Sequence, residues 1–308
     1  MPMQFLTDAL EVNPHYWFDF PSAPCNTITT LYKSTILSNA NRGTIMPIDT
    51  DKYNIKTVAR CFQILDYASD QSGPISIQDV CAALDTNSNM AFRLLASLQN
   101  SGYMTKDPYT GLYAISLKTL KLSRSALQSQ EIRKVTMPYL ELLWNQFPKA
   151  NVNMAVFYNG EVLMLDRIDT QSTPRTYFTP GRQLPFHCSA LGKVLTCELP
   201  EQELDKLIHD KGLNRYTEKT ITDPKALKEE LAKVRKEGAA RDRNEFIDGD
   251  NCSAVPVRGR DGKIIAGISV SALTSNMAVE EIEAAIPRLK DTASKISYVM
   301  GYTTQPGM

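Results

Sequence analysis

Glycine and serine occupy one face of a predicted strand near the C-terminal end of the chain. Residues 253–258 and 263–271 are β-rich runs separated by Asp261-Gly262, which predicts a β-hairpin. Because side chains alternate along a strand, one face of the second run holds Ile264, Ala266, Ile268 and Val270, and the other holds Ile265, Gly267, Ser269 and Ser271. The latter face is small and hydroxylated. It is therefore either an ordinary solvated surface or one wall of a small-molecule pocket.

Three side chains just upstream could reach the same space. They are Asp242, Asp250 and Cys252. Ionised carboxylates accept hydrogen bonds, whereas the hydroxyls of Ser269 and Ser271 both donate and accept them. Such a set favours a polar small molecule as the ligand.

Residues with catalytic potential are present but poorly arranged. His187 and Cys188 are adjacent, so in an extended chain their side chains point opposite ways and make a poor nucleophile–base pair. Cys252 has no identifiable partner among the three histidines, and none of the six cysteines forms a Cys-x-x-Cys pair. We therefore expect no catalytic residue, metal or cofactor. A Cys-dependent enzyme is the alternative interpretation.

The composition favours a globular protein without a strongly charged surface. The 308 residues are 43% hydrophobic, and Lys plus Arg equals Asp plus Glu at 34 each, so no overall field favours a polyanion. The apolar runs are too short to span a membrane, and the start of the chain lacks the pattern of a signal peptide. We expect a cytoplasmic protein with reduced thiols.

Helical periodicity begins near Ile55, after a segment of residues 1–50 that we leave unassigned. The pattern predicts a helix from there to about residue 71, a second at 77–84 capped by Ser76, and a third from about Ser88 to Asn100. A hairpin of residues 103–106 and 112–116 follows. This order predicts a winged helix-turn-helix domain at residues 51–116. It would bind double-stranded DNA or, alternatively, serve as an adaptor module for protein contacts.

The third helix is the usual reader of the major groove in such domains. Candidate DNA-binding residues at or near its start are Asn87, Ser88, Asn89 and Arg93. Their side chains can bond to base edges, although Arg93 could instead contact phosphate or brace the fold. Lys106 lies in the predicted wing, where we expect a phosphate contact.

The rest of the chain is predicted to form a linker helix and an α+β domain. A helical run covers residues 117–147, with residues 117–134 as the linker and a break expected near Thr136 to Pro138. Residues 135–308 then interleave strands and helices, including a hairpin turning at Asn159-Gly160 and a helix beginning near Ser189. We predict a mainly antiparallel sheet in a GAF- or profilin-like sensor domain.

Several ordered segments resemble the isocitrate lyase regulator (IclR) family of bacterial transcription factors. They are FRLLASLQNSGYMTKDPYTGLYAIS, GRQLPFHCSALGKVL, TEKTITDPKALKEELAKVRKEGAARDRNEF and the hairpin from residue 252 to 271. The C-terminal KISYVMGY is similar to the subgroup that regulates sugar-acid catabolism. The resemblance implies a winged helix-turn-helix, a dimerising linker helix and an effector domain. It also implies homodimers or tetramers on operator DNA, and repression of a catabolic operon under the control of a small organic acid, such as a sugar acid.

The resemblance also implies which residues contact the effector. By motif these are Ala190, Leu191, Asp242, Cys252, Ser269 and Ser271. Asp250 departs from a position that is often apolar in the family. The reading helix departs too, with Ser88-Asn89-Met90-Ala91 where Lys-Ser-Thr-Val is common. We therefore expect a different operator sequence.

These residues together predict the chemical class of the effector. The helix starting at residues 189–191 offers free backbone N–H groups to an anion. Asp242 and Asp250 would repel a second anionic group but accept hydrogen bonds from hydroxyls. The sequence therefore favours a hydroxylated small acid, such as a sugar acid, over a simple 2-keto acid or a flat aromatic acid.

Overall fold

The computed structural model describes residues 55–174 and 178–303, so the unassigned extension of residues 1–50 lies outside the described residues. The chain divides into two compact units. One includes residues up to 98 together with 108–112, and the other includes 99–107 and the chain from 113 onward. Each is described by itself.

The first unit contains the predicted helix-turn-helix. Its helices are α2 (Lys56–Asp70), α3 (Ile77–Leu84) and α4 (Ser88–Asn100). Their buried apolar residues include Ile64, Val80, Leu94 and Leu95. The Ser76 hydroxyl accepts a hydrogen bond from the Asp79 N–H at 3.1 Å, and the Asp79 carboxylate accepts one from the Ser76 N–H at 2.7 Å. This capping box fixes the start of α3.

The predicted hairpin follows α4 in the chain. Strands β1 (Met104–Lys106) and β2 (Tyr113–Ile115) pair antiparallel, with Thr105 opposite Ala114. Met104 and Tyr113 are both 1% exposed, so each strand contributes one large side chain to a buried surface. The predicted order of three helices and a hairpin is confirmed.

The predicted break in the following helical run was placed wrongly. Helix α5 (Thr119–Ser129) ends before α6 (Glu131–Gln146), and the extended residue between them is Gln130. Pro138 lies inside α6, where it removes one backbone hydrogen bond. Helix α6 buries Thr136, Leu140 and Leu143, whereas α5 buries no side chain. Packing along α6 outweighs the cost of the proline, and the helical run is interrupted at Gln130 instead.

The described part of the second unit is built on a six-stranded sheet in the order β5-β4-β3-β8-β7-β6, with all neighbours antiparallel. The strands are β3 (Asn151–Tyr158), β4 (Glu161–Ile168), β5 (Gln183–Leu184), β6 (Ala240–Arg243), β7 (Asp250–Arg258) and β8 (Ile264–Leu273). Asn159 and Gly160 in the β3–β4 turn have φ values of 51° and 79°. Two positive φ values are the signature of the tight hairpin turn predicted from Asn-Gly.

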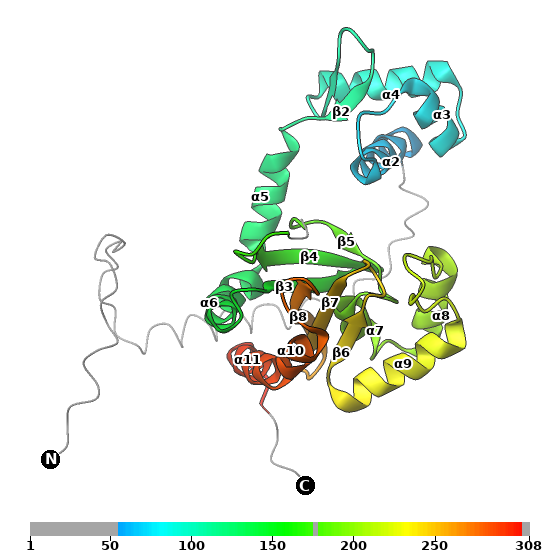
Figure 1. The fold of residues 1–308 in the computed structure, drawn as a ribbon. Coiled ribbons are helices and arrows are strands. Elements are labelled where there is room, and N and C mark those ends of the chain that lie inside the picture. The colour runs from blue at the N-terminus through cyan, green and yellow to red at the C-terminus, as the bar shows by residue number, and fades with distance from the viewer. Residues whose placement is uncertain (1–54, 175–177, 304–308) are drawn as a thin grey trace, which may run out of the picture. The chain divides into compact units, whose positions relative to one another are not determined.

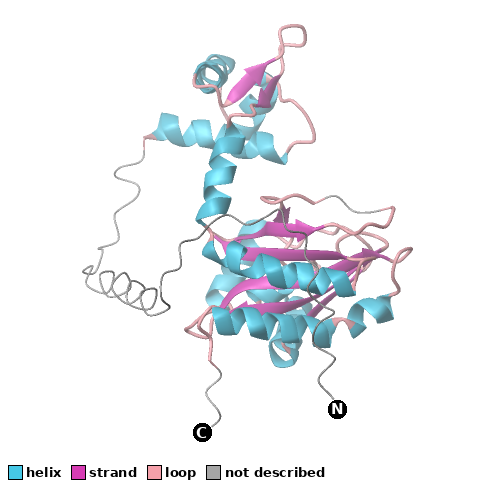
Figure 2. Cartoon of the chain, turned by 90° about the vertical axis from the view of Figure 1, so that its left-hand side faces the viewer, coloured by secondary structure: helices cyan, strands magenta, loops and turns pink. Residues whose placement is uncertain are grey.

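Helices cover both faces of this sheet (Figures 1 and 2). One face packs against α6, α10 (Val279–Ala284) and α11 (Ile286–Val299). The other packs against α7 (Ala190–Thr196), α8 (Glu201–Lys211) and α9 (Pro224–Glu237). The central strands therefore lie between two apolar cores. Any site on the central strands must therefore be bounded by helices or loops. The predicted α+β architecture is confirmed.

The first two side chains of β8 point to the opposite sheet faces from those predicted. Ala266 pairs with Val257 but Ile264 pairs with Arg258, so Ile265 is one extra residue in the strand. This bulge reverses the alternation. Ile265 packs with the α6–α11 core, and Ile264 packs with the α7–α9 core. From residue 266 onward the predicted facing holds.

Candidate functional site

All seven predicted effector residues line one cavity on the α7 side of the sheet. This inner cavity has a volume of about 30 Å³. Its lining comprises Asn153, Met164, Phe178, Leu184, Ser189, Ala190, Leu191, Asp242, Phe246, Asp250, Cys252, Ser269 and Ser271. The residues come from α7, six strands of the sheet and the loops beside them. The structure thus brings together side chains that lie up to 118 positions apart in the chain, although the roles of the predicted effector residues stay predictions.

The serine face of β8 is fixed by an asparagine that the sequence analysis missed. Asn153 lies opposite Ser269 in the β3–β8 register, and its Nδ2 donates to the Oγ atoms of Ser269 and Ser271, at 3.1 Å each. Asn153 is 3% exposed, and its Oδ1 is buried without a hydrogen-bond partner in the described part of the chain. A polar residue followed directly by the apolar residues 154–157 was the available signal. The pairing of β3 with β8 was not visible.

Asp242 is tied to the loop that follows β6. Its Oδ1 accepts hydrogen bonds from the backbone N–H groups of Glu245 at 2.7 Å and Phe246 at 3.4 Å. Burial raises the pKa of Asp242 to about 7, although the bond from Glu245 opposes this rise. Near neutral pH the carboxyl group is therefore close to its midpoint of ionisation.

Asp250 begins β7 and is 8% exposed. Burial raises its pKa to about 6, and the charge of Arg167 acts in the opposite direction. Its Oδ1 is buried and has no hydrogen-bond partner within the described residues. The side chain thus presents an acceptor that is mainly ionised at neutral pH. A ligand hydroxyl could satisfy it.

A buried lysine on α7 also escaped the sequence analysis. Lys193 is fully buried, and its Nζ lies 2.6 Å from Glu245 Oε1 and 2.9 Å from the Arg241 carbonyl oxygen. This ion pair connects α7 to the loop whose backbone contacts Asp242. A lysine within an apolar helical stretch was the available signal, because charged side chains are rarely buried without a partner.

The start of α7 is held close to the preceding loop. The Ser189 hydroxyl accepts a hydrogen bond from the Gly192 N–H at 3.0 Å and donates one to the Pro185 carbonyl at 2.7 Å. A Cβ atom on Gly192 would lie 2.5 Å from that carbonyl oxygen, so only glycine allows this approach. The first N–H groups of a helix, here those of Ala190 and Leu191, have no acceptor within the helix.

The thiols of this region are suited to packing rather than nucleophilic attack. Burial raises the pKa values of both Cys188 and Cys252, so both stay protonated at neutral pH. A protonated thiol is a weak nucleophile. Cys252 therefore lines the cavity as an uncharged side chain.

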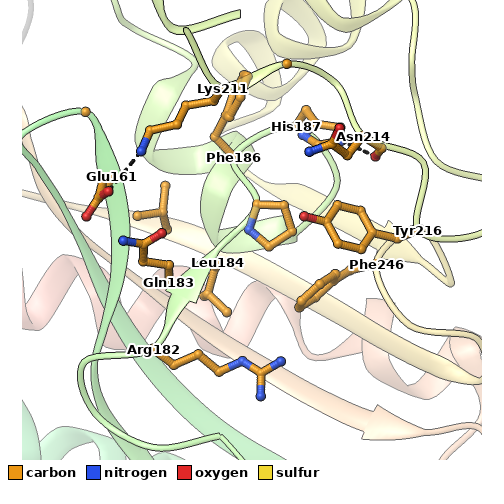
Figure 3. A pocket seen from close by; sticks show the side chains of 14 residues that line it. Glu161, Arg182, Gln183, Leu184, Phe186, His187, Lys211, Asn214, Tyr216 and Phe246 are labelled. Atoms are coloured by element: carbon orange, nitrogen blue, oxygen red, sulfur yellow. Dashed lines mark hydrogen bonds and ion pairs between the residues drawn. The ribbon is translucent and has the colours of Figure 1, made fainter. Parts of the chain in front are cut away.

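Figure 3 shows a larger outer pocket of about 350 Å³, which shares two lining residues with the inner cavity. Both spaces are lined by Leu184 from β5 and Phe246 from the β6–β7 loop. The ring of Phe246 stacks on Phe178 at a centroid distance of 6.1 Å and meets Tyr216 edge-on at 5.2 Å. Phe178 lines only the inner space and Tyr216 only the outer one. Phe246 thus lies at their boundary.

The candidate DNA-reading residues on α4 are exposed. Asn87, Ser88, Asn89 and Arg93 all face solvent at or near the start of the helix. The Asn87 side-chain Oδ1 accepts a hydrogen bond from the Met90 N–H at 2.9 Å, so this side chain caps the helix. Asn89 and Arg93 are one turn apart and share a face.

Lys106 ends β1 and is also exposed. Its Nζ lies 5.3 Å from the centroid of the Tyr113 ring. That contact leaves the ammonium group in solvent, where it can bind an anion.

Comparison with known proteins identifies the family. The IclR helix-turn-helix domain matches residues 57–108, and the bacterial transcriptional regulator IclR C-terminal domain matches residues 124–298. The chain belongs to the IclR family of bacterial transcriptional regulators. It is therefore a DNA-binding transcription factor and not an enzyme.

Individual relatives match almost over their full lengths. The Escherichia coli K12 regulator XynR is 29% identical over 248 residues, which cover 80% of this chain and 98% of XynR. KdgR of the same strain is 29% identical over 260 residues, which cover 84% of this chain and 98% of KdgR. The crystal structure of the Thermotoga maritima IclR is 25% identical to this chain and has a TM-score of 0.59. The match covers 81% of this chain and 100% of the Thermotoga chain.

Within the described residues, no helix is long and apolar enough to cross a membrane.

Proposed function

We propose that this IclR-family regulator represses a catabolic operon in the cytoplasm and releases its operator when a small organic acid binds in the effector domain. The observation that carries this proposal is the convergence on one cavity of the residues Ala190, Leu191, Asp242, Asp250, Cys252, Ser269 and Ser271. A cavity with convergent polar groups and shifted pKa values is typical of a binding site.

The arrangement of charge favours one orientation of the ligand. Its carboxylate lies at the start of α7, where the N–H groups of Ala190 and Leu191 donate hydrogen bonds. Its hydroxyls donate to Asp242 and Asp250, whose raised pKa values reflect carboxylates held in a buried, poorly solvated space. A hydroxylated acid, such as a sugar acid, fits this arrangement better than a simple 2-keto acid or a flat aromatic acid. Only its hydroxyls satisfy both aspartates without a second negative charge.

The DNA-binding part of the proposal rests on α4 and the wing. Asn89 and Arg93 contact base edges in the major groove, and Lys106 contacts phosphate. The regulator binds as a homodimer or tetramer, which supplies two or more copies of α4 to a symmetric operator.

A screen and a gel-shift assay test the proposal together. Thermal shift with panels of sugar acids, 2-keto acids and aromatic acids identifies the ligand class, because a ligand that binds the folded state raises its melting temperature. The acid that stabilises the protein should then dissociate it from a promoter fragment in the gel shift. A stabilising acid that tightens DNA binding would contradict repression. Stabilisation by aromatic acids alone would contradict the sugar-acid assignment.

A further inference from the structure

The inner cavity is too small for the ligand class proposed above. Its volume of about 30 Å³ is roughly a tenth of the lower limit for typical small-molecule sites. A space of this size does not hold a chain of six carbons with several hydroxyls. The remainder of such a ligand needs a second space next to the first.

The outer pocket supplies that space. It is about 350 Å³, within the usual range for small-molecule sites. Its wall includes the polar side chains Glu161, Arg182, Gln183, His187, Lys211 and Asn214 (Figure 3). Donors and acceptors are therefore both present, which suits a chain of hydroxyl groups better than an apolar ring.

His187 gives the outer pocket a buried acceptor. Its Nε2 lies 3.0 Å from the Asn214 carbonyl oxygen, and a carbonyl can only accept, so Nε2 carries the hydrogen. Burial lowers the pKa of His187, and the nearby charge of Lys193 lowers it further, so the ring is neutral and Nδ1 is an acceptor. His187 is 2% exposed, and its Nδ1 is buried with no hydrogen-bond partner among the residues described. A ligand hydroxyl would satisfy it.

Phe246 separates the two spaces and is linked to the inner one through its backbone. Its N–H donates to Asp242 at 3.4 Å, a long bond that is easily lost, and its ring lies between Phe178 and Tyr216. Phe246 therefore links the boundary between the two spaces to a carboxyl group of the inner cavity.

We propose that the effector site has two chambers, and that the effector is a polyhydroxylated acid that extends past Phe246 from the inner cavity into the outer pocket. The carboxylate end binds at α7, and the distal hydroxyls bind His187 and Gln183. The outer pocket is then the part of the site that selects for chain length. This inference rests on the proposed function and adds to it a second binding region.

The test fills the outer pocket without touching the inner cavity. Gln183 is exposed on the edge strand β5 and lines only the outer pocket, so Gln183→Trp should fold normally and occupy that space. The matched control is Ala232→Trp, an exposed position on α9 in a separate pocket of about 540 Å³. Calorimetry on the full-length protein uses two probes, D-gluconate with six carbons and pyruvate with three.

We expect D-gluconate to bind the parent protein at least tenfold more tightly than pyruvate. Gln183→Trp should weaken D-gluconate binding at least tenfold and leave pyruvate binding within twofold. Ala232→Trp should leave both affinities unchanged. Phe246→Ala should speed the association of D-gluconate in stopped-flow fluorescence, because no aromatic ring has to be displaced.

Three results would overturn the inference. Equal binding of D-gluconate to Gln183→Trp and to the parent would remove the outer pocket from the site. Binding of pyruvate but not D-gluconate by the parent would restrict the site to the inner cavity while regulation by an organic acid stands. Binding of neither probe would contradict both the two-chamber site and the sugar-acid effector.

Discussion

The ammonium group of Lys193 lies 2.6 Å from the carboxylate of Glu245, and both side chains are largely withdrawn from solvent. The pair joins α7, which provides one wall of the inner cavity, to the loop that carries Phe246. A buried charge that loses its partner costs far more than an exposed one, because the remaining ion is poorly solvated. This contact therefore holds α7 and the β6–β7 loop in a fixed arrangement.

We expect Lys193→Met to lower the free energy of unfolding by about 3–5 kcal/mol, since Glu245 is left buried without its counter-charge. Chemical denaturation of the effector domain within the full chain measures this change. The surface variant Lys295→Met, which breaks an exposed pair with Asp291, should change it little. If Lys193→Met and Lys295→Met have equal effects, the buried pair does not contribute as described.

A double variant separates loss of charge from loss of packing. Lys193→Met combined with Glu245→Gln removes both charges, so part of the lost stability should return. If the double variant loses more unfolding free energy than the two single variants lose together, packing around the Lys193 side chain matters more than its charge.

The two aspartates of the inner cavity predict a pH dependence of stability. Their pKa values of about 7 for Asp242 and about 6 for Asp250 both lie above the ordinary value of 3.8. Between about pH 4 and 7 the folded protein therefore binds more protons at these groups than the unfolded chain, so their contribution to stability falls as pH rises. Asp242→Asn should flatten this fall. Denaturation midpoints at several pH values measure it, and an unchanged slope in Asp242→Asn would contradict the raised pKa.

Local patterns predicted most of the elements in this chain. Ser76, Asn159-Gly160 and the apolar spacing of α9 each specify a cap, a turn or a helix through neighbouring residues alone. The errors arise where distant packing decides. Pro138 is accommodated because α6 is packed on the sheet, and Ile265 is displaced by a bulge that depends on β7.

The candidate site was predictable only in part for the same reason. Motif resemblance indicated the residues on α7, β7 and β8, and the structure brings them together. Asn153 was missed because its importance comes from the β3–β8 register. Lys193 was missed because its partner is 52 positions away. The outer pocket depends on loops at His187, Tyr216 and Phe246 whose approach no local pattern encodes.

The exposed start of α4 predicts a specific effect on operator recognition. Asn89→Ala should weaken binding to the cognate operator more than to random DNA, because base contacts specify while phosphate contacts position. Lys106→Ala should instead weaken binding to both the operator and random DNA. It should also reduce the slope of log affinity against log salt concentration by about one, because one phosphate contact is lost. Fluorescence anisotropy over a range of salt concentrations compares the two. Equal losses of Asn89→Ala on both DNAs would argue against base reading by this side chain.

Asp250→Leu tests the chemical class of the effector. The carboxylate is buried, and its Oδ1 has no hydrogen-bond partner within the described chain, so a ligand hydroxyl can donate to it. Leucine cannot accept this bond, and a polyhydroxy acid should bind less tightly by about 1–3 kcal/mol in calorimetry. A ligand without hydroxyls should be affected much less. DNA affinity without effector should stay nearly unchanged, because the substitution lies in the effector domain. Full-affinity binding of the polyhydroxy acid to Asp250→Leu would remove this residue from the site, and with it the reason for preferring a sugar acid.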